Sequence, residues 1–457
     1  RPFFLQGLDM FATPIQLFYS RRIGEVLGAG KLLASHGAFE LGALSVLTDD
    51  RASHHALRMR GTAGGGTLGV LGTAQMQDDP MLHDALSGAA DGAWRSESGT
   101  WVIGGQVAGS QRQGGEPEQR PDGTTLMAGD TGAGTTLHVA KEGGTLRGEV
   151  AYEGYSRRFM IDDLGYLPRS NVHHVSLDLE AYTAHAHGPL LESRSRIEIY
   201  GRRNLDGLVL PSGYQWNISG TAKGMWELFL ELHWRPNYFD DREFGDGRAL
   251  QRSGRLGVEL GIHSDPRRVV VGSFELTAQS THAGSFTEAA STFSVRPRDD
   301  VELAIEPDLL VTRGEPRYLE DDMFGPRFAR QDATSFGVTT RAIWTLQRDL
   351  TLQAYVQALL ATIRYRDAFT ADPLDRVVGL DDLQPASFDA AMYDAREGAL
   401  NATAVARWEY RPGSTAFLVY SHAQAPTDAR ATWDPAALVH GPQQDVVLLK
   451  LSWAWLR

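Results

Sequence analysis

The chain has 457 residues, a formal net charge of −13 at pH 7 and no cysteine. The lack of cysteine excludes disulfides and thiolate metal sites, and an acidic chain without a Lys/Arg-rich run is unsuited to nucleic acid, whose binding depends on cations at phosphates. No run approaches the ~20 apolar residues of a membrane helix, so a helical membrane protein is excluded. A membrane β-barrel is not excluded, because only every second residue of its strands faces lipid.

The chain is expected to form one domain after a short lead-in. Residues 1–13 are apolar without a period, and we expect them to be a lead-in segment, a linker or a short plug. Residues 14–457 are predicted to be a single β-domain, because no linker or change in composition divides them. Its first strand is predicted at residues 14–22. Gly- and Ala-rich hairpins follow at residues 30–36 with 38–47, 55–61 with 67–75, 86–95 with 100–111 and 134–141 with 145–155.

The second half of the chain shows clearer strands. Leu256, Leu260 and Ile262 alternate with Arg255 and Glu259. Since successive side chains of a strand point to opposite faces, this pattern predicts a strand with one apolar and one charged face. Further hairpins are predicted at residues 171–183 with 190–202, 213–222 with 225–235, 252–263 with 268–280, 285–295 with 300–313, 334–346 with 350–366 and 399–410 with 415–424, and a last strand at 446–456.

Short turns alternate with longer loops, which are predicted at residues 112–132, 157–170, 239–250, 314–332, 367–397 and 425–443. Outer-membrane barrels have this asymmetry, with short periplasmic turns, longer extracellular loops and, in single bacterial chains, an even number of strands. We therefore predict an all-β fold, namely a single closed, up-and-down antiparallel transmembrane β-barrel of about 22 strands, within a range of about 20–22. A soluble all-β protein, such as tandem sandwiches or a propeller, also buries one strand face and is the alternative.

Large aromatic residues near strand ends favour the membrane. Trp226 and Trp234 stand at the two ends of an apolar series that contains Leu228, Leu230 and Leu232. Rings at the two membrane–water boundaries form the aromatic girdles of such barrels. The predicted girdle consists of Trp216, Trp226, Trp234, Trp344, Trp408, Tyr410, Trp453 and Trp455.

The opposite strand faces carry charges of both signs. A wet lumen explains them, because inward charges can pair and stay hydrated, although a solvated face of a soluble sheet explains them nearly as well. Such charges either select which solutes enter a pore or form a self-paired network that stiffens a wide barrel and conducts nothing. The residues predicted to line the lumen are Arg194, Arg196, Glu227, Glu231, Arg235, Arg255, Glu259, Glu275, Glu302 and Glu306.

Two N-terminal stretches, Arg1-Pro2-Phe3-Phe4-Leu5-Gln6-Gly7 and Phe18-Tyr19-Ser20-Arg21-Arg22-Ile23-Gly24, resemble the domain-of-unknown-function family 5916. The ending Leu449-Lys450-Leu451-Ser452-Trp453 is compatible with that family. The resemblance implies a bacterial outer-membrane β-barrel, usually found after a carbohydrate-binding-module-9-like domain, and a role in carbohydrate or polymer handling. It supplies no catalytic residues. The alternative is that Tyr19 and the arginine pair merely anchor a strand end at the membrane boundary.

No catalytic, metal or cofactor site is predicted. His173 and His174 are adjacent in a strand and face opposite sides, and the acidic loops at residues 320–322 and 381–382 are expected to be solvated rather than to bind Ca²⁺. Ser421 and His422 likewise face opposite sides, and the chain has no G-x-S-x-G motif.

The leading hypothesis is therefore a pore or transporter for polar solutes or polymers, carbohydrate among them, in the bacterial outer membrane. Its expected partners are the lipid bilayer, the barrel assembly machinery and a polar small molecule or glycan. A non-conducting anchor or binding platform that displays an upstream domain and long loops is the alternative, and a barrel hydrolase is a third hypothesis. The chain begins at Arg1 without a signal peptide, so we expect it to be a fragment or a processed chain.

Overall fold

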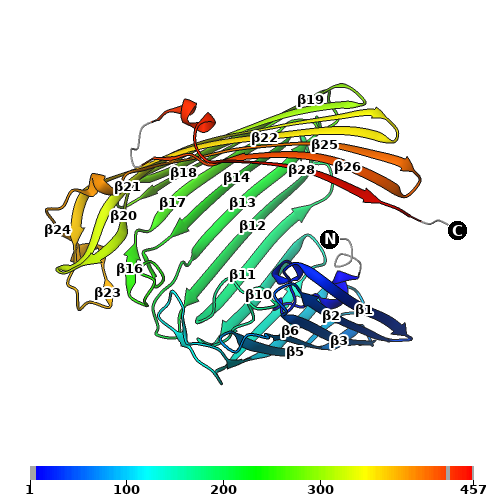
Figure 1. Cartoon of the computed structure of the whole chain (residues 1–457), viewed down its shortest axis with the longest axis horizontal. Coiled ribbons are helices and arrows are strands. Elements are labelled where there is room, and N and C mark those ends of the chain that lie inside the picture. Colours follow the sequence, from blue (N-terminus) through cyan, green and yellow to red (C-terminus); the bar gives the residue numbers. More distant parts are fainter. Residues whose placement is uncertain (1–6, 429–432, 455–457) are drawn as a thin grey trace. The chain divides into compact units, whose positions relative to one another are not determined.

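A computed structural model describes residues 7–428 and 433–454 of the chain, and in these residues the fold is all-β (Figure 1). Their regular elements are strands and short 3-10 helices, and 21 of the strands have nine residues or more. By contacts the chain divides into two units, each of which contains a meander of long antiparallel strands. Unit 1 comprises Arg1–Tyr182, Ser195–Gln215 and Arg235–Arg252, and unit 2 comprises Thr183–Arg194, Trp216–Trp234 and Ser253–Arg457.

Unit 1 contains a meander in which each long strand pairs antiparallel with the next. Its strands are β1 (Val26–His36), β2 (Phe39–Thr48), β3 (Ser53–Ala63), β4 (Gly66–Met76), β5 (His83–Arg95), β6 (Trp101–Gly114), β9 (Thr131–Lys141), β10 (Leu146–Tyr155) and β11 (Val172–Thr183). Two small hairpins lie in its loops, β7 (Glu118–Gln119) with β8 (Thr125–Leu126) and β15 (Tyr238–Asp240) with β16 (Ala249–Arg252). The 3-10 helices η1 (Leu8–Phe11) and η2 (Ser20–Arg22) precede β1.

Unit 2 contains a second antiparallel meander. Its strands are β17 (Arg255–His263), β18 (Val270–Thr281), β19 (Ser285–Arg298), β20 (Val301–Asp322), β21 (Gly325–Gln347), β22 (Leu350–Thr370), β25 (Ala395–Arg411), β26 (Ser414–Gln424) and β28 (Gln443–Ser452). The residues of β12 (Leu190–Arg203), β13 (Gly213–Ala222) and β14 (Glu227–Arg235) are divided between the two units. The loops of unit 2 hold β23 (Val377–Val378), β24 (Gln384–Pro385), β27 (Thr427–Asp428), η3 (Leu380–Asp382), η4 (Ala390–Tyr393) and η5 (Pro435–Val439).

The expected alternation of faces is present. In β6, Trp101, Ile103 and Val107 are exposed, whereas Val102 and Gln106 between them are buried. We call the face with the exposed large apolar residues the apolar face, and the other the polar face. Because the strand period is two, one apolar face and one polar face run through each meander.

Residues 14–22 do not form the predicted first strand. They are irregular up to η2. Ile15 and Leu17 are buried on either side of exposed Gln16, but Leu17 and Phe18 are buried in succession, which breaks the alternation. Without this strand the described residues contain 21 long strands, which lies within the predicted range of 20–22. The predicted loop at residues 314–332 is also wrong, since β20 and β21 run through it and leave Met323 and Phe324 as the turn. Cross-strand pairing past the irregularities at Thr312–Glu315 and Tyr318–Glu320 extends both strands.

Candidate functional site

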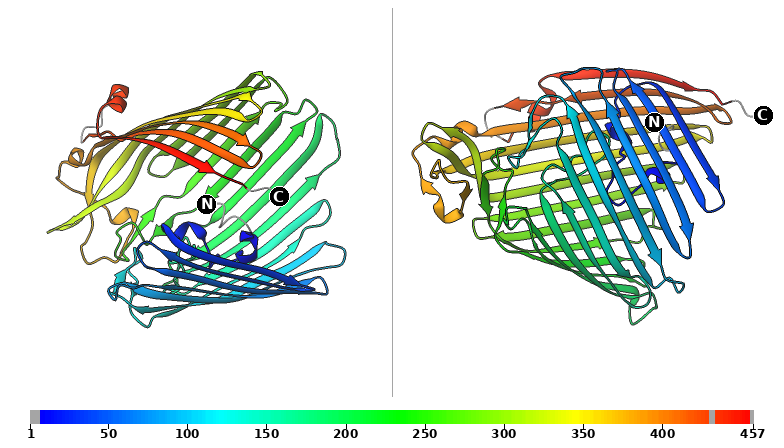
Figure 2. Two further views of the ribbon diagram at one scale, coloured as in Figure 1. Left: turned by 45° about the vertical axis from the view of Figure 1, so that its right-hand side comes forward. Right: turned by 90° about the horizontal axis from the view of Figure 1, so that it is seen from below.

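Residues 7–23, which we call the N-terminal strap, cover the polar face of unit 1. Figure 2 shows this segment, with η1 and η2 in dark blue, against one side of the first strands. Its apolar side chains form a buried cluster with residues of β2, β3, β4 and β6. The cluster joins Met10, Phe11, Ile15, Leu17, Phe18 and Ile23 to Leu44, Val46, Ala56, Leu71 and Ala108. The face opposite the exposed apolar residues is therefore partly filled by the chain's own N-terminal segment.

The strap runs along the length of the β1–β2 hairpin. A Cβ on Gly7 would collide with Leu33, near the β1–β2 turn, and a Cβ on Gly42 would lie 2.7 Å from Met10 Cγ in mid-sheet. At the other end, Tyr19 N donates to Leu164 O at 2.6 Å. The strap thus passes from the short-turn end of unit 1 to its long-loop end, where β1 begins.

The long loops of unit 1 bind one another and the strap through charged side chains. Arg169 contacts both carboxylate oxygens of Asp241 at 3.0 and 2.9 Å, and Asn204 Nδ2 donates to Asp241 Oδ2 at 2.9 Å. Asp162 accepts from Arg120 at 2.8 Å and lies 3.6 Å from Arg22 of the strap. Charge-assisted contacts of this kind fix loops more firmly than neutral hydrogen bonds do.

Arg242, in these loops, is an arginine whose pKa is shifted by burial. Burial lowers the pKa of the Arg242 guanidinium, and the neighbouring Arg169 adds to that effect. Arg242 Nη1 donates to Pro168 O at 3.1 Å, so the side chain contributes to the loop contacts through a backbone acceptor.

A charged recess of about 490 Å³ opens among β9, β10, β11 and β12 of unit 1. Arg147 Nη1 lies 3.2 Å from Glu180 Oε1, and Arg196 contacts both oxygens of Asp178 at 2.5 Å. The recess is lined by Ala140, Lys141, Glu142, Arg147, Gly148, Glu149, Asp178, Glu180 and Arg196. It offers both signs of charge within one small volume, an arrangement suited to polar or zwitterionic solutes.

The polar face of unit 2 has an excess of acids. Glu259 of β17 interacts electrostatically with Glu231, Glu275 and Glu288 from three neighbouring strands. His263 Nε2 lies 3.1 Å from Glu275 Oε1. Cationic partners are present further along the face, with Arg296 3.3 Å from Glu302 and Arg341 3.5 Å from Glu306.

All ten residues predicted to line a lumen lie on polar faces. Arg196 and Arg235 belong to unit 1, and the remaining eight residues belong to unit 2. The ten residues are therefore described as two groups and not as one site. Arg235 donates to Tyr200 Oη at 3.4 Å and its guanidinium lies 5.7 Å from the centre of the Tyr238 ring. Arg255 lies partly buried at the start of β17, on the same face as Glu259.

Sequence reasoning missed three contributors to the polar faces. Glu288 and Asp308 lie on the polar face of unit 2, where they pair with Thr277 and Gly337 across the strands. The period of β20 could have revealed Asp308, which follows Glu302 and Glu306 on the same face, whereas Ser, Thr and Ala dilute the pattern around Glu288 in β19. The third contributor is the strap: the sequence predicts a short plug only at residues 1–13, whereas the buried segment extends to Ile23.

The predicted girdle residues lie on the apolar faces. Trp216, Trp226, Trp234, Trp344, Trp408 and Trp453 are all exposed, and Trp455 lies outside the described residues. Trp408 Nε1 donates to Asp349 Oδ2 at 3.4 Å, and Tyr410 donates to Ser452 O at 3.0 Å. Their polar atoms thus bind groups at the short-turn end, while the rings stay on the apolar surface.

The adjacent histidines His173 and His174 each contact a side chain of β10. His173 Nδ1 lies 2.8 Å from the Tyr152 hydroxyl, and His174 lies on the opposite face, 3.8 Å from Glu153. Across the described residues, no group of three or more His, Asp or Glu side chains is placed to hold a metal ion. Nor does the described part of the chain contain a helix of the length and hydropathy needed to cross a bilayer.

The chain is an all-β protein whose long antiparallel strands have one apolar and one polar face. It belongs to the domain-of-unknown-function family DUF5916, whose model matches residues 72–436, so the expected family is confirmed over a range that excludes the N-terminal stretches. No curated protein is similar in sequence. Among solved structures, the RagAB peptide transporter matches with a TM-score of 0.39 and 8% identity over 82% of this chain, which spans about half (51%) of that chain.

Proposed function

We propose that the chain forms a membrane-embedded β-barrel of the bacterial outer membrane, with its apolar faces toward lipid and its polar faces toward a solute pathway. The observation that carries this proposal is the exposure of large apolar side chains along each meander, including Leu68 at 75%, Val447 at 71% and Leu137 at 58%. Soluble monomers rarely leave apolar patches of more than a few hundred Å² in water. Acyl chains cover such a surface without cost, and the indole groups near the short turns suit the membrane boundary.

The solutes we propose are polar molecules or polymers, glycans among them. The recess beside Arg196 and Asp178 supplies paired charges of both signs, and the polar face of unit 2 supplies an acidic surface. Charged walls of this kind tune which solutes enter a pore. The strap acts as an internal plug on unit 1, because it occupies the polar face there.

The test is conductance of the full chain in a planar bilayer, compared with a variant that lacks residues 7–23. We expect a small or gated current from the full chain and a larger, steady current after removal of the strap. Insertion is checked first by protection from added protease, and folding by the difference in SDS-gel migration between unheated and heated samples. No current above leak from either protein, although both are folded and inserted, would remove the pore.

A second candidate function is a binding platform. It is supported by the unit 1 loops that are hydrogen-bonded to one another through Asp241, and by the 3-10 helices η3 and η4 in the loops of unit 2. Loops fixed in this way present a constant surface. Glycan or protein pull-down with and without residues 367–397 distinguishes the two functions, since binding that is lost together with these residues, in a protein that conducts nothing, favours the platform.

A further inference from the structure

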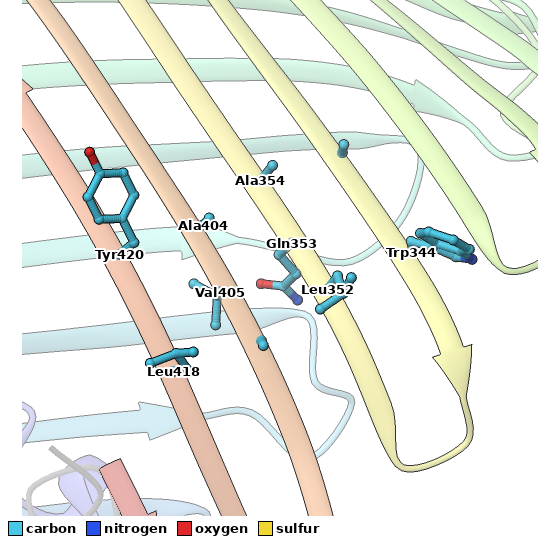
Figure 3. A pocket seen from close by; sticks show the side chains of 10 residues that line it. Trp344, Leu352, Gln353, Ala354, Ala404, Val405, Leu418 and Tyr420 are labelled. Carbon is cyan, nitrogen blue, oxygen red and sulfur yellow. The ribbon is translucent and has the colours of Figure 1, made fainter. Parts of the chain in front are cut away.

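The charged recess of unit 1, among β9, β10, β11 and β12, is lined mainly by ionisable side chains. Seven of its nine lining residues carry a charge, three of them cations and four of them carboxylates. The hollow in Figure 3, which measures about 420 Å³ on the apolar face of unit 2, is instead lined by aliphatic and aromatic side chains and one amide. The lining of the recess therefore selects a ligand by charge, which the apolar hollow does not do.

Other parts of unit 1 already hold most of these charged groups. Besides its contact with Glu180, Arg147 donates through Nε to a backbone carbonyl of the β9–β10 turn at 3.2 Å. Glu142 of that turn accepts from Arg95 at 2.6 Å. Lys141 donates through Nζ to a backbone carbonyl of β10. Each of these side chains is thus fixed by a partner within the chain itself.

Glu149 and Arg196 are the exceptions. Glu149 is exposed, and among the described residues it forms no hydrogen bond or ion pair. Arg196 uses Nε and Nη2 for the two oxygens of Asp178, so in the described part of the chain the N–H groups of its Nη1 have no partner. The Arg196 side chain is 51% exposed. The recess thus offers one free carboxylate and one guanidinium with donors that are not yet used.

The strand register places these two groups on either side of Asp178. Glu149 of β10 pairs directly with Asp178 of β11, and Asp178 holds Arg196 of β12. Neighbouring strands lie about 5 Å apart, so the main chains that carry Glu149 and Arg196 are separated by roughly 10 Å. Because the guanidinium reaches back to Asp178, the space between it and the free carboxylate is shorter than that. It fits a ligand whose opposite charges lie a few bonds apart.

We propose that the recess binds a small zwitterion of the amino acid or dipeptide class, with its ammonium group at Glu149 and its carboxylate at Arg196 Nη1. Charge-assisted hydrogen bonds then form at both ends of the ligand, and they are stronger than neutral ones. An uncharged sugar leaves both groups unmatched, a cation alone leaves Arg196 unmatched, and an anion alone meets an excess of carboxylates. This inference rests on the proposed function, because it names a class of solute for the polar face of unit 1.

The test is isothermal titration calorimetry of the full chain, folded in detergent micelles, with the dipeptide L-alanyl-L-alanine. The N-acetylated dipeptide lacks the ammonium group, the dipeptide amide lacks the carboxylate, and maltose is a polar solute without charge. The variant E149Q removes the free carboxylate and keeps the shape of the side chain. E97Q is the matched control, because Glu97 is an exposed carboxylate in the β5–β6 turn of the same unit and does not line the recess.

We expect the wild type and E97Q to bind the dipeptide equally, and E149Q to bind it about tenfold more weakly, because a hydrogen bond between two charged groups is lost. Acetylation of the dipeptide should weaken its binding to the wild type by about the same factor and have little effect on its binding to E149Q. R196K keeps a cation beside Asp178 but lacks the additional N–H groups of a guanidinium. It should therefore weaken binding of the dipeptide and leave binding of the dipeptide amide unchanged.

Equal affinity of the wild type and E149Q for the dipeptide overturns the site. So does binding of maltose or of the acetylated dipeptide that is as tight as binding of the dipeptide, or a folded wild type that binds no dipeptide. A chain that inserts and conducts but fails these tests overturns this inference alone. A chain that is folded and inserted but conducts nothing overturns the proposed pore, whatever its affinity for the dipeptide, so the two failures are distinguishable.

Discussion

Gln106 on β6 binds both backbone polar atoms of Ile15 in the strap. Ile15 N donates to Gln106 Oε1 at 2.6 Å, and Gln106 Nε2 donates to Ile15 O at 3.4 Å. Both residues are 2% exposed. One side-chain amide therefore satisfies a backbone segment that has no strand partner, and this is how an irregular segment can be buried against a sheet.

The first prediction follows from that pair. Substitution Gln106→Leu keeps the side-chain bulk but leaves the buried Ile15 N–H without its acceptor, which costs about 1–3 kcal/mol. We expect the free energy of unfolding in urea to fall by that amount and residues 7–23 to exchange amide hydrogens faster. Gln113→Leu, at an exposed position of the same strand, is the control. Unchanged exchange in the strap of Gln106→Leu would show that the amide pair does not hold it.

A second prediction concerns the close approach of the strap to β2. Gly42 has no side chain, and a Cβ there would lie 2.7 Å from Met10 Cγ and 3.1 Å from Phe11 Cζ. Gly42→Val is expected to destabilise the strap by about 1–3 kcal/mol through overpacking. Limited proteolysis should then cut within residues 7–23 sooner. Gly72→Val is the control, since a Cβ at Gly72 meets nothing within 4 Å, and equal cleavage of the two variants would contradict the packing described.

The sequence predicted the strands better than the segments that contact them. The hairpin at residues 252–263 with 268–280 is close to β17 and β18, because alternation at period two is a local signal that every residue repeats. Ile15 and Leu17 gave the same local signal at residues 14–22, yet they are buried against Leu44 and Val46 as part of the strap. That outcome depends on a sheet surface contributed by distant strands, so a local pattern cannot reveal it.

The polar faces show a similar division between local and tertiary information. Period two correctly places Glu231, Glu259 and Glu275 on one face of their strands, but it does not show which carboxylates come close together. The register of the strands determines which carboxylates come close together. Glu288 lies near Glu259 because both residues pair with Thr277, one from each side. Register depends on turn length and pairing, and the irregularities at Val295–Arg298 and Thr312–Glu315 shift it in ways that no residue count predicts.

The third prediction is a pH dependence at the β17–β18 turn. The Arg267 guanidinium holds the pKa of Asp265 at about 2, below its ordinary value of 3.8. Because the folded-state pKa is the lower one, the stabilisation is fully present above pH 3.8 and is lost as the pH falls through about 2. We expect the Tm of the wild type to fall over that window more steeply than the Tm of Asp265→Asn, as measured by circular dichroism. Asp299→Asn in the β19–β20 turn is the control, and parallel curves for wild type and Asp265→Asn would refute the linkage.

The last prediction concerns ion selectivity and depends on the acidic face of unit 2. The substitutions Glu231→Gln, Glu259→Gln and Glu275→Gln together remove three neighbouring charges with little change in shape. Two opposite unit charges about 4 Å apart in water attract each other by about 1 kcal/mol, which raises the local concentration of a cation beside one carboxylate about fivefold. Salt screens this attraction beyond about 8 Å at physiological ionic strength. We therefore expect the cation-to-anion permeability ratio, measured from the reversal potential in a KCl gradient, to fall roughly two- to fivefold, and the difference to shrink in 1 M salt. Glu97→Gln, in the turn between β5 and β6, should leave the ratio unchanged. If the triple variant keeps the ratio of the wild type while conducting normally, the acidic face does not line the pathway, and its charges serve only to hold the strands together.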